Sequence, residues 1–570
     1  MAFRWIYAQP DDRELVSVLQ TQLGISETIA RLLAIRGIQT FEQARSFFRP
    51  ELTALHDPYL MKDMHLASTR LAQAVRSGEK VLIYGDYDVD GTTATSVMLT
   101  FLRQFGVDAY YYIPHRFKDG YGISEDGIIQ AIEQKATLVV SVDCGITAIE
   151  EAKYARQKGI DLIICDHHTA GDIIPDAIAV LDPKRPDCSY PFDGLSGAGV
   201  AFKLVQATLQ ELGLPPEKAN PLLDLVAISI ASDIVPIVDE NRILMREGLK
   251  MINSEPRKGI KALMDLVRME IGSISTSQIV FSLGPRINAA GRMGDASTAV
   301  ELLIAETDEE AAGKARELEG INIKRRTTDT ETMEQALAQI EEKINLENNN
   351  AVVLHNPDWH LGVIGIVASR IVDLYCRPTI MLSTVDGQVK GSARSIRGFN
   401  IYDALKSCED LLVQFGGHEF AAGLTMEESM LEAFMERFQQ LASKKLCDED
   451  FKQELTIDSV IDLSNVDLKF WKLLSQFEPF GPDNLRPIFV SKGLRVVGTP
   501  SIVGKGHLKM KVAQNGSAVF DAIGFNMHEH LPAVRNAQNG ALNMAYVLEE
   551  NTWQNRTSIQ IRIKDIAVES

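Results

Sequence analysis

The chain has 570 residues, of which 45% are hydrophobic and 24% charged, and its formal net charge is −19. This composition excludes a disordered chain and a protein coated in basic surface, and it predicts a globular protein of several domains. Residues 451–570 hold 13 Lys or Arg and 12 Asp or Glu, so the acidity lies in residues 1–450. Bound divalent cations would offset part of that acidity.

The cysteines and the apolar runs indicate the cellular location of the protein. Six cysteines are scattered without a C-x-x-C motif, which predicts reduced thiols in a cytoplasmic protein and no zinc–cysteine site. The first residues, MAFRWIYAQPDDREL, contain no apolar stretch of signal-peptide length. The most membrane-like run, residues 222–238, contains Asp224, Asp233 and Pro236, so it predicts a buried helix. We therefore expect no membrane association.

The chain begins with an N-terminal segment, residues 1–75, that predicts short helices broken at Pro50 and Pro58. Between residues 76 and 305, short apolar β-rich runs alternate with helical patterns, and this rhythm predicts an α/β domain with a parallel sheet covered by helices. The expected strands are Val81–Tyr84, Ala109–Ile113, Leu138–Val142 and Leu162–Cys165, and the expected helices lie near Thr92–Phe105, Glu125–Gln134 and Ala148–Gln157.

The first of these strands leads into an acidic turn, GDYDVDGTT, which carries Asp86, Asp88 and Asp90. In open α/β sheets, ligands bind at the carboxyl ends of the strands, and carboxylates this close repel each other unless protons or cations neutralise them. An EF-hand loop would need a bidentate Glu where this chain has Val97, so that alternative fails. A solvated acidic turn remains the alternative on this stretch alone.

Polar side chains also follow the later apolar runs of this region. Asp143 follows the third expected strand, His167 and His168 follow the fourth, and Asp233 follows the run Ala227–Ser232. With Asp88 and Asp90 they make six residues of the types that bind metals, most of them at one predicted sheet edge. Two divalent ions held there could activate a water and neutralise a phosphoryl oxygen. Mixed imidazole and carboxylate ligands favour Mn²⁺, with Mg²⁺ as the alternative ion.

The rest of the chain predicts three further parts. Residues 306–350 are charged and rich in alanine, and they predict a long connecting helix and a hinge. Residues 351–450 predict a smaller α/β domain with strands at Ala351–Leu354, Thr379–Leu382 and Val389–Ala393. Residues 451–570 contain short strands separated by turns, which predict a small closed barrel such as an oligonucleotide-binding (OB) fold. Those strands are Pro487–Val490, Leu494–Val497, His507–Val512, Val519–Gly524, Asn543–Leu548 and Ser558–Ile563.

Several long motifs, in order, resemble a known family. GDYDVDGTT, VDCG, CDHH and ASDIVP resemble the motifs of the DHH phosphoesterase superfamily, and GSAR with FGGHEFAAG resembles its DHHA1 domain. More closely, IPHRFKDGYG, SGAGVAFKL, GPRINAAGRMGDA, WHLGVIGIVASR and EPFGPDN are similar to the RecJ family of single-strand-specific 5′→3′ DNA exonucleases. The resemblance implies a parallel-sheet DHH catalytic domain, a DHHA1 domain and a C-terminal OB fold.

The resemblance also implies roles for the polar residues. The implied metal ligands are Asp88, Asp90, Asp143, His167 and Asp233. Asp143 would bridge two ions, and His168 would serve as the acid or support a ligand. Many superfamily members have a histidine four residues before the first ligand aspartate, where this chain has Tyr84. One ion is then held more loosely, or Asp86 takes part.

Other residues of the matching motifs are candidates for binding DNA. Arg116 and Tyr121 would hold a terminal phosphate and stack a base. Arg286, Asn288 and Arg292 would contact phosphates near the scissile bond, and Ser392, Arg394 and His418 match phosphate-binding positions. For any one of these arginines, an ordinary ion pair is the alternative.

The predicted barrel offers three more candidates. Lys509 and Lys511 alternate with apolar residues, which places both lysines on one face of a strand. Trp553 lies in an expected polar loop, Glu549–Arg556, where its ring could stack a base while the lysines contact phosphates. The alternative is that Trp553 covers the barrel core.

The sequence therefore predicts a two-metal 5′→3′ exonuclease of single-stranded DNA, active in DNA repair and recombination. One rival is a DHH phosphodiesterase of short oligoribonucleotides or cyclic dinucleotides, which needs no strand-holding third domain. The other rival is a non-catalytic scaffold in a replication or repair assembly. By analogy, a helicase and a single-strand-binding protein would be natural partners.

Overall fold

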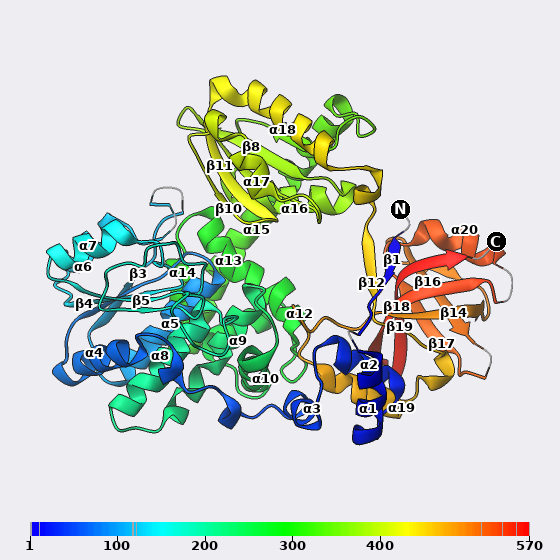
Figure 1. Ribbon diagram of the computed structural model, residues 1–570, viewed down its shortest axis with the longest axis horizontal. Coiled ribbons are helices and arrows are strands. Elements are labelled where there is room, and N and C mark those ends of the chain that lie inside the picture. Colours follow the sequence, from blue (N-terminus) through cyan, green and yellow to red (C-terminus); the bar gives the residue numbers. More distant parts are fainter. Residues whose placement is uncertain are drawn as a thin grey trace.

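The structure is a computed structural model that describes residues 3–10, 12–116, 119–120, 122–514, 516–537, 540–553 and 556–568. Three lobes form a triangle (Figure 1). The first lobe contains the parallel sheet, the second follows the long helix, and the third is the C-terminal barrel. Within the described residues, no helix is long and apolar enough to cross a membrane.

The first lobe is built on a five-stranded parallel sheet with the strand order β3-β2-β4-β5-β6. Its strands are β2 (Val81–Tyr84), β3 (Ala109–Tyr112), β4 (Leu138–Val142), β5 (Asp161–Cys165) and β6 (Ala179–Leu181). The four expected strands are confirmed. The short strand β6 was not expected, because three apolar residues alone do not stand out as a strand.

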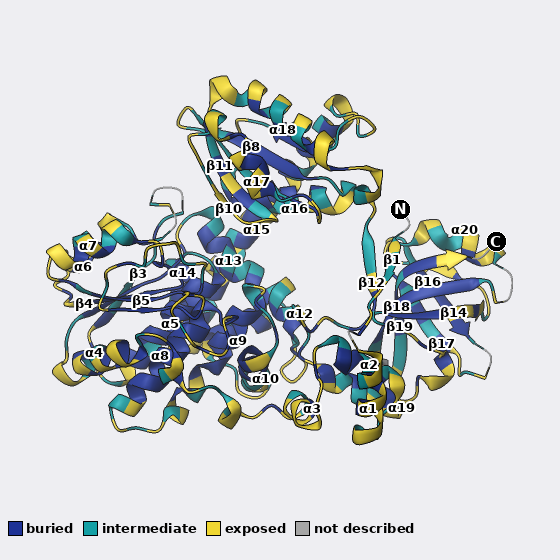
Figure 2. Cartoon of the chain, in the orientation of Figure 1, coloured by how far each residue is buried: buried dark blue, intermediate teal, exposed yellow. Residues whose placement is uncertain are grey.

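Helices cover both faces of this sheet, which explains why its strands are continuously apolar. Val81 and Ile83 face a core formed with α4 (Met64–Ser77), α5 (Val89–Gln104), α8 (Gly197–Glu211) and α9 (Leu223–Ser232). Leu82 and Tyr84 point to the other face, toward α6 (Glu125–Glu133) and α7 (Ile149–Gln157). Figure 2 shows the strands buried between helices with exposed outer faces.

A helical region links the first lobe to the second. It comprises α10 (Asp239–Ile252), α11 (Lys258–Leu266), α12 (Thr276–Gln278), the π-helix η4 (Ile279–Leu283), α13 (Gly284–Met293) and α14 (Ser297–Leu303). The glycine-rich insert thus forms α13. The connecting helix α15 (Asp308–Lys343) then runs for 36 residues, which confirms the long helix expected here.

The second lobe is a mixed sheet with the order β10-β11-β9-β8-β7. Its strands are β7 (Val352–His355), β8 (Thr379–Val385), β9 (Gln388–Arg394), β10 (Gln414–Gly417) and β11 (Ala421–Glu427), and its helices are α16 (Leu361–Tyr375), α17 (Ile401–Lys406) and α18 (Leu431–Lys445). Strands β10 and β11 were not expected, because their glycines and alanines have low strand propensity.

The third lobe is a barrel whose sheet has the order β13-β14-β18-β19-β17-β16-β15, closed by a pairing of β14 with β16. Its strands are β13 (Ser459–Val460), β14 (Phe489–Val496), β15 (Ser501–Val503), β16 (His507–Ala513), β17 (Phe520–Gly524), β18 (Leu542–Trp553) and β19 (Arg556–Val568). Two expected strands are one strand, β14, with a register shift between Ser491 and Leu494. The expected loop from Glu549 is wrong, because β18 continues through Trp553.

The N-terminal helices pack on the third lobe. Residues 16–44, which lie in α1 (Arg13–Leu23), α2 (Glu27–Ile35) and α3 (Phe41–Phe48), share one apolar core with barrel residues up to Ile566. In addition, β1 (Arg4–Tyr7) pairs in parallel with β12 (Glu454–Ile457). Figure 1 shows these blue helices beside the orange and red barrel. The barrel core is therefore built from both ends of the chain.

One buried arginine joins the first lobe to the third. Arg242 of α10 donates hydrogen bonds to the backbone carbonyls of Phe47, Phe477, Gln476 and Glu478 at 2.9–3.1 Å. Burial lowers the pKa of Arg242 to about 9. Burying a guanidinium costs free energy unless its N–H groups are hydrogen-bonded, and these carbonyls supply the partners. Because the carbonyls belong to the third lobe and Arg242 to the first, separating the lobes would leave the guanidinium without them.

Candidate metal centre and substrate cleft

The turn between β2 and α5 presents two aspartates to the carboxyl edge of the parallel sheet. Asp88 is the N-cap of α5, and its carboxylate accepts a hydrogen bond from the helix backbone at 3.0 Å. Asp90 is buried and accepts hydrogen bonds from the N–H groups of Gly197 and Ala198 at 2.7 and 2.9 Å, and from the Ser229 hydroxyl at 2.7 Å. The N-terminus of α8 therefore orients Asp90 and favours its negative charge.

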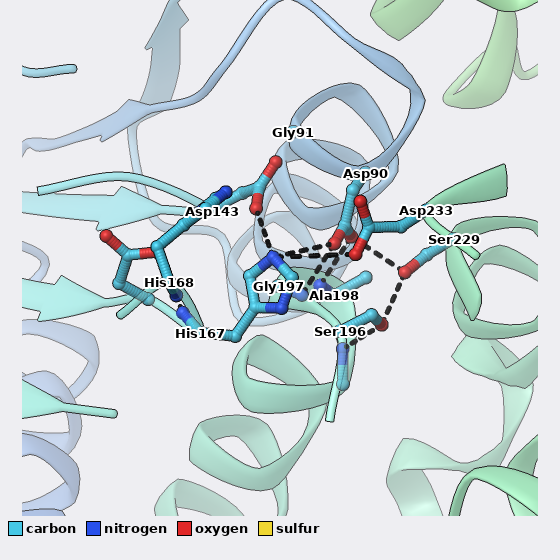
Figure 3. A network of polar contacts seen from close by, with 12 residues as sticks. Asp90, Gly91, Asp143, His167, His168, Ser196, Gly197, Ala198, Ser229 and Asp233 are labelled. Atoms are coloured by element: carbon cyan, nitrogen blue, oxygen red, sulfur yellow. Dashed lines mark hydrogen bonds and ion pairs between the residues drawn. The ribbon is translucent and has the colours of Figure 1, made fainter. Parts of the chain in front are cut away.

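His167 lies where three carboxylates meet (Figure 3). Its Nε2 atom is 3.1 Å from Oδ1 of Asp143 and 3.6 Å from an oxygen of both Asp90 and Asp233. His167 and Asp143 are 4% and 2% exposed, so little water reaches them. Burial lowers the pKa of His167, which favours the neutral imidazole that binds metals.

The acidic and imidazole groups form two adjacent sets that could each hold a cation. One set is Asp86, Asp88 and Asp143, and the other is Asp90, His167 and Asp233. Within each set, one ligand atom from each residue lies within 4.8 Å of the others. A third set, Asp143, His167 and His168, overlaps both. The contact between Asp143 and His167 therefore places two candidate ion positions side by side.

These buried carboxylates repel each other, and bound cations would stabilise their charged form. Burial, together with neighbouring aspartates, raises the pKa of Asp86 and Asp143 well above the usual range. Burial and then Asp90 raise the pKa of Asp88, and the same causes raise the pKa of Asp233 to about 8. Oδ1 of Asp86, Oδ1 of Asp143 and both ring nitrogens of His167 make no hydrogen bond with the described residues. Unpartnered buried oxygen and nitrogen atoms of this kind suit divalent metal ions.

His168 is held by the aspartate that precedes the histidine pair. Its Nδ1 atom lies 2.7 Å from Oδ1 of Asp166. The Asp166 carboxylate also accepts hydrogen bonds from the backbone N–H groups of Ile146 and His167 at 2.8 and 2.7 Å. Burial alone would lower the pKa of His168, but the Asp166 hydrogen bond and charge raise it to about 9. The ring lines a cavity between the first and second lobes.

Tyr84 is a packing residue on the far face of the sheet. Its hydroxyl donates a hydrogen bond to the carbonyl of Gly122 at 3.0 Å, and its ring belongs to the core beneath α6 and α7. A Cβ on Gly127 would lie 2.2 Å from that ring, so the two residues are closely fitted. The hydroxyl therefore does not belong to the sets that could hold a cation, whereas Asp86 belongs to one of them.

A cavity of about 820 Å³ separates the first and second lobes beside the metal centre. Arg116, Arg292, Lys390 and Arg394 line it, together with His168. Burial, then the charge of Arg116, lowers the pKa of Arg292 to about 10 and also lowers the pKa of Arg394. Crowded, partly desolvated cations of this kind bind phosphate favourably, because an anion relieves their repulsion.

Glycines bring the second lobe close to this cleft. A Cβ on Gly365 would lie 2.8 Å from Oγ of Ser392 and 3.0 Å from Nη2 of Arg394. A Cβ on Gly362 would lie 2.0 Å from the carbonyl oxygen of Arg292. Helix α16 can therefore approach both α13 and β9, which sets the width of the cleft.

The structure places the expected DNA-binding residues in different surroundings. Arg116, Arg292, Ser392, Arg394 and His418 all line the cleft. Arg286 instead pairs with Glu319 of α15 at 2.7 Å, and neither Arg286 nor Asn288 lines the cleft. On the barrel, Lys509 and Lys511 are exposed on β16 between buried residues. Tyr121 and the side chain of Trp553 lie outside the described part of the chain.

Two cleft residues were missed from the sequence. Tyr87 lies under the guanidinium of Arg116, with 5.0 Å from that group to the ring centre. Lys390 stands directly before the GSAR motif on β9. Both lie inside or beside motifs already singled out, so a search for aromatic and basic neighbours would have found them.

Comparisons with known proteins identify the domains and the family of this chain. The DHH family N-terminal domain matches residues 80–230, the DHHA1 domain matches residues 348–444, and the RecJ OB domain matches residues 457–565. The single-stranded-DNA-specific exonuclease RecJ of Bacillus subtilis is 38% identical over 99% of this chain and 71% of its own length. The protein of that name from Escherichia coli is 33% identical over 97% of this chain and 98% of its own length.

Solved structures give the same result. RecJ from Thermus thermophilus in complex with Mn²⁺ matches with a TM-score of 0.83 and 28% identity, covering 99% of this chain and 80% of that chain. Its complex with Mg²⁺ matches with a TM-score of 0.78 and 26% identity, covering 100% and 79%. The identities and the coverage, together with the three matched domains, establish that this chain belongs to the RecJ family of single-stranded-DNA-specific exonucleases.

Proposed function

We propose that this protein is a metal-dependent exonuclease that hydrolyses single-stranded DNA from its 5′ end. The observation that carries the proposal is the position of the metal centre, where two adjacent ligand sets open onto a cleft lined by cations. The carboxylates suit metal ions, and the neighbouring arginines suit the phosphates of a nucleic acid. The barrel of the third lobe is a further indication that the substrate is a long strand, because a short substrate would need no third domain to hold it.

The residues present fit two divalent ions, with Mn²⁺ favoured by the mixed ligands. Asp86, Asp88 and Asp143 would hold one ion, and Asp90, His167 and Asp233 would hold the other. Asp143 would be shared between the two sets, because its Oδ1 atom lies 3.1 Å from Nε2 of His167 in the second set. When bound, such a pair supplies an activated water and neutralises charge on the phosphoryl group. Ser229 and α8 keep Asp90 oriented throughout.

The remaining cleft residues bind and orient the strand. Arg292 lies on the wall of the cleft and contacts the phosphate at the scissile bond. Arg116, Ser392, Arg394 and His418 hold the terminal 5′-phosphate on the side of the second lobe. His168, held by Asp166, donates a proton to the leaving 3′-oxygen. A terminal phosphate held at a fixed distance from the metal centre accounts for removal of nucleotides from one end.

Two further features support this assignment. All six cysteines are free thiols, which suits a protein of the reducing cytoplasm. Lys509 and Lys511 present two exposed cations on one face of the barrel, where they can contact the backbone of a long strand.

The test is product analysis with oligonucleotides labelled at either end, single- and double-stranded, in Mn²⁺. We expect mononucleotides from the 5′ end of single strands only. Release from the 3′ end would contradict the polarity, and hydrolysis limited to dinucleotides would favour a small-substrate phosphodiesterase. Absence of any metal-dependent hydrolysis would favour a scaffold. Asp143→Asn is the matched inactive control, since Asn tolerates the left-handed φ of 62° at this position.

A further inference from the structure

A second cavity, of about 790 Å³, lies between the first and third lobes. Its walls come from three parts of the chain that are distant in sequence. Helix α3 and Arg49 form one wall, α10 and the loop at residues 272–277 form another, and residues 475–486, which lead into the barrel, form the third. The cavity lies outside the metal centre and shares no lining residue with the substrate cleft.

The lining of this cavity is positively charged, although the chain carries a net charge of −19. Four cations line it, Arg49, Arg246, Lys250 and Arg486, against one carboxylate, Glu478. Arg486 lies 3.3 Å from Glu478, so that pair is neutral as a whole. Lys250 also has a carboxylate partner, Glu247, so Arg49 and Arg246 are the lining cations without an ion pair among the described residues. A polyanion would relieve the repulsion between them.

Two of these cations are available to a ligand. Arg49 is exposed and makes no side-chain hydrogen bond or ion pair with the described residues. Lys250 is exposed and pairs with Glu247, its neighbour on the same helix, in the kind of surface contact that is weak. Arg246 is fixed by the carbonyl of Phe48 at 2.9 Å, with the rest of its guanidinium at the cavity wall.

Hydroxyl and aromatic groups complete the lining. Thr276 is 7% exposed, and its Oγ1 atom has no hydrogen-bond partner among the described residues. Phe48 and Phe480 also line the cavity, and the guanidinium of Arg486 lies 4.9 Å from the centre of the Phe480 ring. Cations beside aromatic rings are typical of sites that bind single strands, because bases stack while cations contact phosphates.

The cavity is connected to the catalytic cleft by one run of helix. Helices α12, η4 and α13 continue from Thr276 in the cavity to Arg292 in the cleft (Figure 1). At 1.5 Å per residue, the distance along this run from Thr276 to Arg292 is about 24 Å. The cavity thus lies between the cleft and the segment that enters the barrel.

We propose that this cavity is a binding subsite for the backbone phosphates of the substrate strand, several nucleotides beyond the scissile bond. It deepens the proposed exonuclease function and rests on it. Arg49 and Lys250 contact phosphates, and Phe48 and Phe480 pack against bases. The subsite guides the strand from the barrel to the metal centre.

The test compares two double variants. Arg49→Gln with Lys250→Gln removes two cations from the cavity. Arg45→Gln with Lys261→Gln removes two exposed cations of α3 and α11 that do not line this cavity. Binding of a long fluorescent oligothymidylate is measured with chelator present, so that no hydrolysis occurs, over a range of salt concentrations.

For the cavity variant we expect binding about tenfold weaker than wild type, with a salt slope reduced by about 1.4, because each phosphate contact on a single strand contributes about 0.7. The control variant keeps the wild-type slope. In Mn²⁺, the cavity variant loses kcat/KM on the long strand and keeps the wild-type value on a trinucleotide, which is too short to reach the cavity.

Four other results would contradict either the subsite or the proposed function. An unchanged salt slope in the cavity variant, or an equal loss in both variants, would overturn the subsite. Equal losses on the trinucleotide and on the long strand would also overturn it, because the effect would then arise at the metal centre. Failure of the wild-type protein to degrade any single strand would instead reject the proposed function, while the binding comparison would still decide the subsite.

Discussion

Gly197 leaves no space for a side chain beside Asp143. A Cβ on Gly197 would lie 2.6 Å from the Cβ of Asp143 and 2.7 Å from its Oδ1 atom. The same glycine donates its N–H to Asp90 at 2.7 Å. One residue at the start of α8 therefore positions a carboxylate from each of the two ligand sets, and the close approach requires glycine.

Gly197→Ala should reduce Mn²⁺ affinity and exonuclease activity at least about a hundredfold, because the added methyl displaces Asp143 from its ligand position. Isothermal titration with Mn²⁺ and rates of nucleotide release would measure both effects. Gly199→Ala is the matched control on the same helix, since its Cβ would meet nothing closer than 3.4 Å. Wild-type turnover in Gly197→Ala would show that Asp143 is not a ligand.

Asp143→Asn should abolish hydrolysis and at the same time stabilise the metal-free protein by on the order of 1 kcal/mol, because it removes one of several buried carboxylates that repel each other. Thermal unfolding with chelator and with Mn²⁺ would measure the change. Wild type should gain stability from Mn²⁺, and the variant should gain much less.

The control for Asp143→Asn is Asp172→Asn, which makes the same charge change at an exposed position. It should leave activity, metal response and stability unchanged. A variant Asp143→Asn that is still stabilised by Mn²⁺ as much as wild type would contradict the bridging position.

Two arginines, Arg286 and Arg292, lie six positions apart on α13, but their substitution should have different effects on activity. Arg292→Gln should lower kcat/KM about 10²–10³-fold, the usual cost of losing one group that stabilises developing charge. Arg286→Gln should change kcat/KM only a few-fold, because Arg286 is engaged by Glu319. Steady-state rates on one single-stranded substrate would compare them, and equal losses would show that Arg286 also reaches the substrate.

Deleting residues 452–570 should leave an aggregating protein. The deletion removes most of the core that covers residues 16–44 and three of the four lobe-joining hydrogen bonds of Arg242 described above. A protein reduced to residues 52–450 should be more stable, because both halves of that core are removed together. Size-exclusion chromatography and thermal unfolding would compare the two, and a monomeric, cooperatively folded protein of residues 1–451 would contradict the shared core.

Asp182 should make stability depend on pH. The residue is fully buried, one oxygen has no hydrogen-bond partner among the described residues, and burial raises its pKa to about 7. A raised carboxyl pKa means that folding stability is lost as pH rises from about 4 to about 7 and then stays level. Asp182→Asn should therefore be more stable than wild type by on the order of 2 kcal/mol at pH 8.

The difference between Asp182→Asn and wild type should vanish near pH 4, where both side chains are uncharged. Chemical unfolding of metal-free protein across this pH range would measure it. A difference that is constant with pH would indicate altered packing and would contradict the titration.

Local sequence patterns predicted the buried strands and the long helix correctly, because these elements depend mainly on their own residues. The strands Val81–Tyr84 and Leu138–Val142 have the predicted bounds, because continuous β-branched apolar runs mark buried parallel strands. The residues that follow such strands converge at one edge, so the sequence alone predicts that Asp143 and His167 lie together. The 36-residue helix α15 could also be predicted from the sequence, because few helix-breaking residues interrupt it.

Other features depend on contacts that a local pattern does not contain. The partner of residues 16–44 lies more than 400 residues away in sequence, so no window could reveal it. Arg286 and Arg292 have similar neighbours in the motif, and only the position of α15 decides which one is paired. Strand β11 pairs with the edge of β9, and β10 pairs with β11. These backbone pairings outweigh the low strand propensity of the glycines in both strands.

The shared core has a consequence for how the protein is made. Helices α1–α3 leave the ribosome first, yet the barrel strands that cover them follow more than 400 residues later. At about 5–20 residues per second, this delay is roughly 20–80 s. The apolar faces of the nascent N-terminal helices must stay uncovered for that whole period, so chaperone binding to these helices, rather than to the parallel-sheet domain, should limit the yield of folded protein.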